Sequence, residues 1–443
     1  MNRRVTSVSG VFGLLCILSA AAAEAQDAKH DLEPAFTEVE PKVIAWRRDI
    51  HQHPELSNRE FRTAAKVAEH LQSLDFDSVE TGIAHTGVVG TLKGAKPGPT
   101  IVLRADMDGL PVKEQTGLPF ASEAIGEYRG EEVPVMHACG HDTHVAMLMG
   151  AAEVLAKNRD HLAGTVKFFF QPAEEGAPPG EKGGASLMIE EGVLAGPDAP
   201  EAIFGLHAWP VPAGTINYRP GSFMAASDEL YIDIQGRQTH GSAPWMGVDP
   251  IHVAAQIMNA LQAIPSRHID ITKGPAVITI GSIHGGVRGN IIPDNVEMMG
   301  TIRTFDVGER EELHARLRKT VAGIADAAGA TATVTIKPYA PVTGNDPELL
   351  QKMMPTLEWA AGEDKVVEHP LITGAEDFAH FQKHVPGLYL MLGINEEGVA
   401  AGEAAANHSP LFNANEDALI VGVRALVGLA LDYANAGARN TSR

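Results

Sequence analysis

The feature of this chain that most restricts its fold is a change, near Ser222, in the order of its predicted helices and strands. Upstream of that point, apolar segments with the length of buried strands alternate with helical segments. This alternation predicts an α/β sheet covered by helices. We predict a helix over 41–53, strands over 87–92, 100–104, 165–170 and 202–206, and a helix over 145–155.

Downstream of Ser222 the predicted order is β-α-β-β-α-β, which is the layout of a ferredoxin-like domain. The strands are predicted at 229–235, 276–283, 296–304 and 331–338, and the helices at 250–263 and 311–327. Beyond Pro341 the α/β pattern returns, with a strand over 388–392 and a helix over 417–434. The smaller domain is therefore predicted to be inserted in the larger one.

The length of the chain agrees with this division, because 443 residues exceed what a single hydrophobic core fills. We predict an α/β, two-domain protein. Residues 26–221 and 339–443 form a larger domain with a mixed sheet, and residues 222–338 form the inserted ferredoxin-like domain. The formal net charge of −21 argues against nucleic acid or an anionic membrane surface as a partner, since both bind clustered lysine and arginine.

The first 25 residues have the pattern of a secretory signal peptide. Arg3 and Arg4 precede an apolar run over 11–23, and Ala23 and Ala25 supply the small residues of a cleavage site after Ala25. The apolar run is shorter than the ~20 residues of a membrane span, which disfavours a membrane anchor. We therefore expect a secreted or periplasmic protein that has no membrane partner after cleavage.

The segment from Met136 to His144 places one thiol and three imidazoles in a short stretch. After signal cleavage Cys139 is the only cysteine, so no intramolecular disulfide is possible. Metal ligation explains an unpaired thiol beside histidines better than the alternative, a buried inert thiol. Cys139 and His141 flank a glycine in a segment expected to be extended. Residues two apart in an extended segment share a face, so both side chains can reach one cation.

The other histidines of this segment are weaker candidates. Asp142 or Thr143 is suited to cap the helix that follows. His144 then lies on that helix, where a packed histidine that orients its neighbours is the favoured interpretation. We leave His137 out of the ligand set.

Two adjacent carboxylates, Glu174 and Glu175, follow Pro172 at the end of an apolar strand. A pair of glutamates is usually a solvated surface feature. The end of a buried strand, however, is where open α/β sheets bind ligands. One carboxylate there can ligate a metal while its neighbour acts as a base. The residues do not say which glutamate has which role, but the pattern indicates a metal-dependent hydrolase.

Three further histidines occupy loops or strand ends. His207 is predicted to end an apolar strand, His408 lies in a loop near the C-terminus, and His240 lies in the inserted domain. In a chain with 19 histidines each one taken alone is more often structural than catalytic. The position at a strand end favours His207.

Taken together, these segments resemble the dinuclear-metal aminoacylase/carboxypeptidase family. The resemblance is to its amidohydrolase branch, which includes hippurate hydrolases and indole-acetyl-amino-acid hydrolases, and it covers nearly the whole mature chain. The segments that carry it are 47–51, 53–55, 104–111, 137–144, 171–176, 205–207, 286–293, 374–378 and 408–410. One departure is the segment 177–184, whose Pro/Gly/Lys sequence lies next to the glutamate pair.

The resemblance implies a role for each matching residue. Two divalent metal ions would be held by five ligands: Cys139, His141, Glu175, His207 and His408. Cys139 would stand where relatives outside this branch have a bridging carboxylate. Glu174 would be the general base that takes a proton from the metal-bridging water, and Asp108 a carboxylate that orients a ligand, with Asp106 a weaker candidate.

The same resemblance implies the inserted domain's roles, as a lid and as the interface of a homodimer. His240 and Asn290 would reach the substrate carboxylate or the oxyanion. Arg288 is a further candidate for gripping a carboxylate, and Arg303 another. Zinc suits the donor set, while manganese, cobalt and nickel also bind mixed N/O/S sites.

The expected reaction is hydrolysis of the amide bond of an N-acyl amino acid, with an N-acetyl, N-benzoyl or aryl-acetyl group, to a carboxylate and a free amino acid. A dipeptidase or carboxypeptidase would use the same metal centre on a different small substrate. A noncatalytic ligand-binding receptor is the alternative from another class, and the presence of Glu174 disfavours it. A cysteine-nucleophile amidase is a third alternative, which predicts inactivation by thiol reagents independent of metal.

Overall fold

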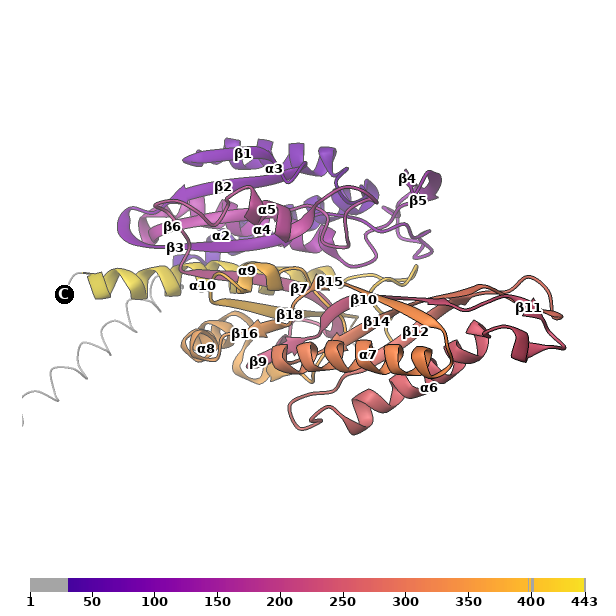
Figure 1. Cartoon of the computed structure of the whole chain (residues 1–443). Coiled ribbons are helices and arrows are strands. Elements are labelled where there is room, and N and C mark those ends of the chain that lie inside the picture. The colour runs from indigo at the N-terminus through magenta and orange to yellow at the C-terminus, as the bar shows by residue number, and fades with distance from the viewer. Residues whose placement is uncertain (1–30, 397, 400–401, 442–443) are drawn as a thin grey trace, which may run out of the picture. The chain divides into compact units, whose positions relative to one another are not determined.

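A computed structural model describes residues 31–396, 398–399 and 402–441 of the chain (Figure 1). The predicted signal peptide lies outside the described residues. Residues 219–347 and 368–384 form one compact unit, here called unit 2, and the other described residues form unit 1. In the described part of the chain, no helix has both the length and the apolar composition needed to cross a membrane.

Unit 1 is built on an eight-stranded mixed sheet with the order β1-β2-β6-β3-β7-β18-β8-β17. The four central strands, β6, β3, β7 and β18, pair in parallel, and antiparallel strands β2 and β8 flank them. The bounds are β1 Ser78–Ile83, β2 Gly87–Lys93, β3 Lys96–Asp106, β6 Ala163–Gln171, β7 Ala202–Pro212, β8 Ile216–Tyr218, β17 Val366–Glu368 and β18 Gly387–Asn395. A short hairpin, β4 Ile125–Tyr128 with β5 Glu131–Pro134, lies outside this sheet. The predicted mixed α/β sheet is confirmed.

Two helices of unit 1, α4 and α10, pack on the parallel strands. Helix α4, His141–Lys157, contacts β3, β6 and β7, and helices α2 and α10 contact α4 in turn. Every residue of α4 from its start to Leu155 is buried, because small and apolar side chains surround the helix on all sides. The other helices are α2 Glu33–Gln52, α3 Phe61–Ser73, α5 Gly184–Glu190, α8 Pro347–Ala361 and α10 Leu419–Thr441.

Three predicted boundaries in unit 1 need correction. The first helix begins at Glu33 rather than Pro41, because Phe36 and Val39 also pack in the core. Helix α4 begins at His141, so neither Asp142 nor Thr143 caps it. Strand β7 does not end at His207 but continues to Pro212, since β18 pairs with it as far as Asn395.

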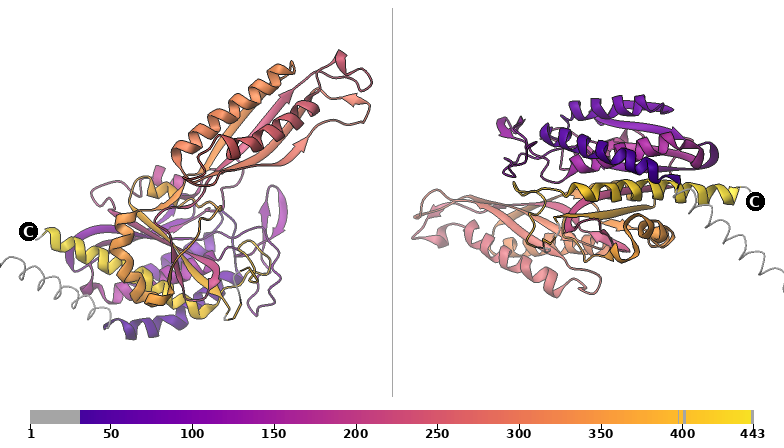
Figure 2. Two further views of the ribbon diagram at one scale, coloured as in Figure 1. Left: turned by 90° about the horizontal axis from the view of Figure 1, so that it is seen from below. Right: turned by 180° about the vertical axis from the view of Figure 1, so that it is seen from behind.

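Unit 2 contains a four-stranded antiparallel sheet with the order β12-β14-β10-β15, covered by α6 and α7 (Figure 2). The bounds are β10 Ala226–Gln235, α6 Pro250–Arg267, β12 Val277–His284, β14 Asn295–Thr304, α7 Val307–Ala327 and β15 Thr331–Ala340. Leu230, Ile232 and Ile234 alternate along β10 and are buried against the helices. This chain order and strand order are those of a ferredoxin-like fold, so the predicted β-α-β-β-α-β insertion is confirmed.

Unit 2 also contains two small sheets and the short helix α9, Ala379–Gln382. Strand β9, Gly221–Met224, pairs with β16, Thr343–Asn345. Strand β11, Thr239–His240, pairs with β13, Ile291–Ile292.

Candidate metal centre

A glycine turn starts helix α4 and separates two of the predicted ligands. Gly140 has φ +91°, a conformation that favours glycine, and a Cβ there would lie 3.0 Å from the Cβ of Ala208. The turn makes His141 the first helical residue and leaves Cys139 just before the helix. The prediction of one extended segment through both residues is therefore wrong, because the chain changes direction at the glycine.

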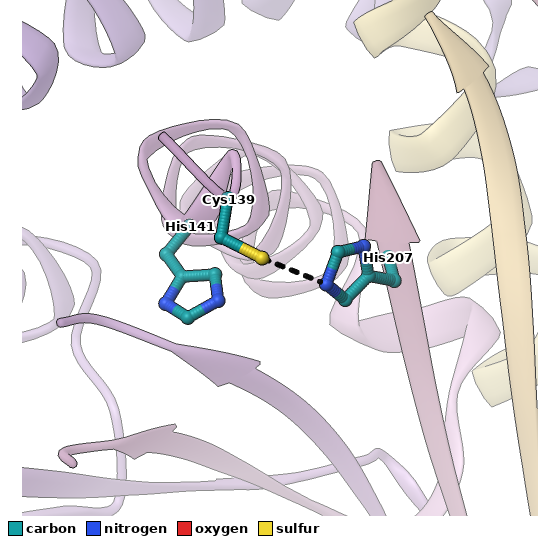
Figure 3. A group of neighbouring side chains, drawn as sticks. All are labelled: Cys139, His141 and His207. Carbon is teal, nitrogen blue, oxygen red and sulfur yellow. Dashed lines mark hydrogen bonds between the residues drawn. The ribbon is translucent and has the colours of Figure 1, made fainter. Parts of the chain in front are cut away.

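The turn nevertheless brings Cys139 and His141 together with His207 of β7 (Figure 3). One ligand atom of each of the three residues lies within 4.8 Å of the others, and all three residues are buried. The Sγ of Cys139 is 3.5 Å from the Nε2 of His207. The Nδ1 of His207 donates a hydrogen bond to the carbonyl of Ala208 at 2.8 Å, so its unprotonated Nε2 faces the thiol. Burial lowers the pKa of His207 well below its usual range and keeps the ring neutral.

The glutamate pair joins this cluster from the loop after β6. Glu174, Glu175 and His141 form one group of possible ligands, and Glu175, Cys139 and His408 form another. The Nε2 of His408 is 3.0 Å from Oε1 of Glu175, and the Nε2 of His141 is 3.8 Å from Oε2 of Glu174. Cys139 thus belongs to two groups, the one with His207 and the one with His408.

Asp108, which follows β3, connects the glutamate loop to His141. Its carboxylate accepts hydrogen bonds from the backbone amides of Glu174 at 3.1 Å and Glu175 at 3.0 Å. Its Oδ1 lies 3.3 Å from the Nδ1 of His141. The hydroxyl of Ser57 donates to the same carboxylate at 2.8 Å. Ser57 was not predicted from the sequence, since a lone serine carries no signal of this contact.

His144 lies on α4, as predicted, and both of its ring nitrogens are hydrogen-bonded. Its Nδ1 is 2.5 Å from Oδ1 of Asp106, and its Nε2 accepts a hydrogen bond from the amide of Ala208 at 2.7 Å. The guanidinium of Arg104 pairs with Asp106 at 2.5 Å. These bonds leave His144 no lone pair for a cation, and they hold the backbone beside His207.

The loop with His408 is fastened to the same elements. His408 has φ +70°, and its amide donates to the carbonyl of Ala138 at 2.7 Å. The side-chain amide of Asn407 donates to the carbonyls of Cys139 at 3.1 Å and Ala208 at 3.2 Å. Asn407 was not predicted from the sequence either, because only its position beside His408 indicates that it contacts this site.

The electrostatics of the cluster suit a cation. Burial alone would lower the pKa of His141, but Asp106, Asp108 and Glu175 outweigh burial and raise it to about 10. Burial, followed by Glu175 and Glu174, raises the pKa of the Cys139 thiol well above its usual range. Among the described residues, neither ring nitrogen of His141 finds a well-aligned hydrogen-bond partner. A thiol, imidazoles and carboxylates crowded in a buried site are a donor set that fits transition-type divalent cations.

The predicted substrate-binding residues lie in unit 2. His240 is in β11, and its Nδ1 accepts a hydrogen bond from the amide of Ser242 at 3.0 Å. The carbonyl of Asn290 accepts from the amide of Gly241 at 2.8 Å, and the carbonyl of Arg288 accepts from that of Ile291 at 3.1 Å. His240, Arg288 and Asn290 therefore gather around the β11–β13 pair.

Comparison with known proteins places this site in a family. The model of Peptidase family M20/M25/M40 matches residues 102–432. The chain belongs to this M20 family. Thermostable carboxypeptidase 1 of Saccharolobus solfataricus is 42% identical over 412 residues, which cover 92% of this chain and 100% of the relative. N-acetylcysteine deacetylase of Bacillus subtilis is 38% identical over 393 residues, 88% of this chain and 96% of the relative.

A solved M20 structure agrees with the fold. A crystal structure of a Bacillus subtilis protein, described as a dinuclear metal binding peptidase from M20 family, matches with a TM-score of 0.74 and 36% identity. The match covers 89% of this chain and 98% of that chain. The family resemblance inferred from the motifs is confirmed, and the chain is a metal-dependent hydrolase. The M20 relationship and the candidate ligand groups support two divalent metal ions per chain.

Proposed function

We propose that this M20 hydrolase cleaves the amide bond of N-acyl amino acids to give a carboxylate and a free amino acid. The observation that carries the proposal is the buried cluster of Cys139, His141 and His207 beside two adjacent glutamates. The similarity to N-acetylcysteine deacetylase supports an acylated amino acid as the substrate. Acetyl, benzoyl and aryl-acetyl groups are the acyl classes to test.

The proposed metal ligands are Cys139, His141, Glu175, His207 and His408. Membership of Cys139 in two of the ligand groups supports a position shared by two cations. Bound cations would supply Lewis acidity, which polarises the scissile carbonyl and makes water more acidic. Zinc is the first candidate because of the thiolate and imidazole donors, and manganese, cobalt and nickel are the others.

Glu174 is the proposed general base. Its side chain is buried close to His141, and Asp108 holds its backbone amide. The carboxylate of Glu174 accepts a proton as the oxygen of water forms a bond to the amide carbon. Glu174 then donates that proton to the amide nitrogen as the C–N bond breaks, and a free amine and a carboxylate result.

The surroundings of Cys139 argue against a cysteine-nucleophile amidase. A nucleophilic cysteine needs a lowered pKa, usually from a histidinium or another cation beside it. Burial and nearby carboxylates instead raise the pKa of Cys139, even though the pKa of the neighbouring His141 is also raised, and His207 is neutral. A carboxypeptidase is a stronger alternative, because the relative named Thermostable carboxypeptidase 1 is 42% identical over the whole of its length.

We also propose that residues 26–221 and 339–443 form the catalytic domain and that residues 222–338 form the inserted domain. Residues 1–25 are proposed to direct export of the protein. His240, Asn290 and Arg288 are proposed to bind the substrate carboxylate. All three are polar and solvent-exposed, and they gather on one small strand pair, which supports this role.

A homodimer through the inserted domain is also proposed. Four exposed apolar side chains lie close to the β11–β13 pair in sequence and support it: Trp245, Met246, Ile251 and Val287, here called the apolar patch. Trp245 is 77% exposed and Val287 is 93% exposed. A Cβ at Gly286 would lie 3.5 Å from Ile251, so the loop with Val287 adjoins the start of α6. Exposed apolar groups of this size favour a protein partner.

The function is tested by metal analysis combined with a hydrolysis screen. The purified protein is assayed for amino acid release from N-acetyl, N-benzoyl and indole-acetyl amino acids and from dipeptides, with Glu174→Ala alongside. We expect about two metal ions per chain, chelator-sensitive turnover, and a Glu174→Ala variant that keeps its metal but loses activity. A metal-free protein with full turnover would contradict the proposal. Faster turnover of dipeptides than of every acyl substrate would favour the carboxypeptidase.

A further inference from the structure

Buried carboxyl groups hold three consecutive backbone amides at the glutamate pair. Asp108 accepts hydrogen bonds from the amides of Glu174 and Glu175. The amide just before them, that of Ala173, donates to Oε1 of Glu60 at 2.9 Å. Asp108 also contacts His141, but Glu60 contacts none of the proposed ligands in any described hydrogen bond, so its function is not explained by metal binding.

The conformation of Ala173 requires an external support. Its φ of +52° lies in the left-handed region, which costs a non-glycine residue roughly 1 kcal/mol or more. Such a conformation persists only when surrounding contacts fix it. Because Ala173 immediately precedes Glu174, a change in its backbone angles would redirect both glutamate side chains.

Glu60 is an unusual group for a purely structural contact. Its side chain is fully buried, and its second oxygen lies 2.5 Å from the hydroxyl of Thr86. Burial and the nearby charge of Asp108 raise the pKa of Glu60 to about 8. The oxygen that faces Ala173 is the acceptor that fixes this amide.

The residues next to Glu60 hold the far end of the same loop. The side-chain amide of Asn58 is buried and donates to Oε2 of Glu181 at 3.0 Å and to the carbonyl of Lys182 at 2.9 Å. Arg59 pairs with Glu181 at 2.6 Å, although both side chains are exposed and this pair contributes little. The segment 58–60 thus contacts the loop of residues 173–182 at both of its ends.

We propose that Glu60 is a positioning residue that fixes the turn at Ala173 and thereby aims Glu174 and Glu175, while Asn58 secures the other end of the loop. The inference rests on the proposed function, in which Glu174 is the base and Glu175 is a metal ligand.

Four variants of the full chain test it. Glu60→Gln keeps a carbonyl acceptor for the amide of Ala173 and matches the carboxyl group in size. Glu60→Leu removes the acceptor. Asn58→Gly removes the second contact and tolerates the φ of +60° at that position. Glu309→Leu is the matched control, because Glu309 is another buried glutamate whose pKa burial raises, and it lies in helix α7 of unit 2.

The first readout is kcat per metal-loaded chain, with KM measured separately. We expect Glu60→Leu to lower kcat about 30-fold or more with KM within about threefold, because small displacements of reacting groups cost that much. Glu60→Gln should stay within about threefold of wild type and Asn58→Gly should fall between the two. Glu309→Leu should keep its kcat.

The second readout needs no activity. Lys182 is exposed, so trypsin cleavage between Lys182 and Gly183 reports how well the loop is held. Cleavage should be faster in Glu60→Leu and Asn58→Gly than in wild type, Glu60→Gln or Glu309→Leu. If Glu60→Leu does not fold, Asn58→Gly gives the same comparison in kcat and in cleavage.

The outcomes separate the two proposals. An inactive wild type would overturn the proposed function, and unchanged cleavage would then overturn the loop support as well. An active wild type whose Glu60→Leu and Asn58→Gly variants keep normal kcat per loaded chain would overturn only the positioning role. Equal loss of kcat in Glu60→Gln and Glu60→Leu would also overturn it, since the neutral acceptor would then be insufficient.

Discussion

The Nδ1 of His141 lies 3.3 Å from Oδ1 of Asp108, and the same aspartate accepts both glutamate amides. Asp108 therefore couples the orientation of a proposed imidazole ligand to that of the loop with the proposed base. Asp108→Asn places an amide NH₂ group where a carboxylate oxygen accepted a hydrogen bond. The NH₂ group then faces an N–H donor, so that this contact becomes repulsive. We expect metal affinity to fall about 10- to 100-fold, measured by titration of the metal-free protein.

Ser57→Ala is the matched control for this prediction. It removes one hydrogen bond to Asp108 and leaves the carboxylate in place, together with its contacts to His141 and the two glutamate amides. Metal affinity should change less than in Asp108→Asn, because the three remaining contacts still orient the carboxylate. Equal affinities of Asp108→Asn and wild type would contradict an orienting role of the aspartate.

Cys139 is shared by two ligand groups, so its substitution tests whether one side chain serves both metal ions. Cys139→Ala removes the shared donor and should lower the metal content to about one ion or fewer per chain after dialysis. Cys139→Asp replaces the thiolate by a carboxylate, which also bridges cations, and should retain more metal than Cys139→Ala. Elemental analysis of both variants measures their metal content. A full metal complement in Cys139→Ala would rule out the shared position.

The predictions from sequence succeeded where a periodic pattern decides the structure. The alternation of Leu230, Ile232 and Ile234 along β10 identifies a half-buried strand, and the buried residues of α4 identify a core helix. The placement of the glutamate pair after an apolar strand likewise pointed to the cluster. These signals are local, since the residues that carry them are neighbours along the chain.

The errors and omissions arise from contacts between distant residues. Gly140 adopts φ +91° where a Cβ would crowd Ala208 and Phe412, and neither residue is near it in sequence. Glu60 reaches the amide of Ala173 across 113 positions, and Asn407 reaches Cys139 across 268. Sequence periodicity does not report such pairs, which form only when the sheet assembles.

The apolar patch predicts the association state of the protein. The double substitution Trp245→Glu with Val287→Glu should convert a dimer to a monomer, because two buried charges without partners would be costly at the interface. Ile271→Glu is the control, since Ile271 is 72% exposed in unit 2 but follows the other end of α6. Mass measured by sedimentation or light scattering reports the result. A wild-type monomer, or a double variant that stays dimeric, would contradict the proposed interface.

Asp228 of β10 predicts how the stability of unit 2 depends on pH. Burial alone would raise the pKa of this carboxyl, but hydrogen bonds from His314 and Arg310 outweigh burial and lower it below its ordinary value of 3.8. A carboxyl with a lowered folded-state pKa stabilises the fold above its unfolded pKa, and that stability is lost as the pH falls through the folded pKa. Asp228→Asn should therefore cost about 1–3 kcal/mol at pH 7.

This cost should shrink as the pH falls below about 4. The wild-type carboxylate then becomes protonated and loses the same ion pair that the variant lacks. Denaturant unfolding of both proteins at several pH values measures the difference, and acid effects common to both cancel. Asp233→Asn is the matched control, because Asp233 lies on the exposed side of the same strand. A difference between Asp228→Asn and wild type that stays constant from pH 7 to the acid limit would show that the charge of Asp228, through its contacts with Arg310 and His314, does not stabilise the fold.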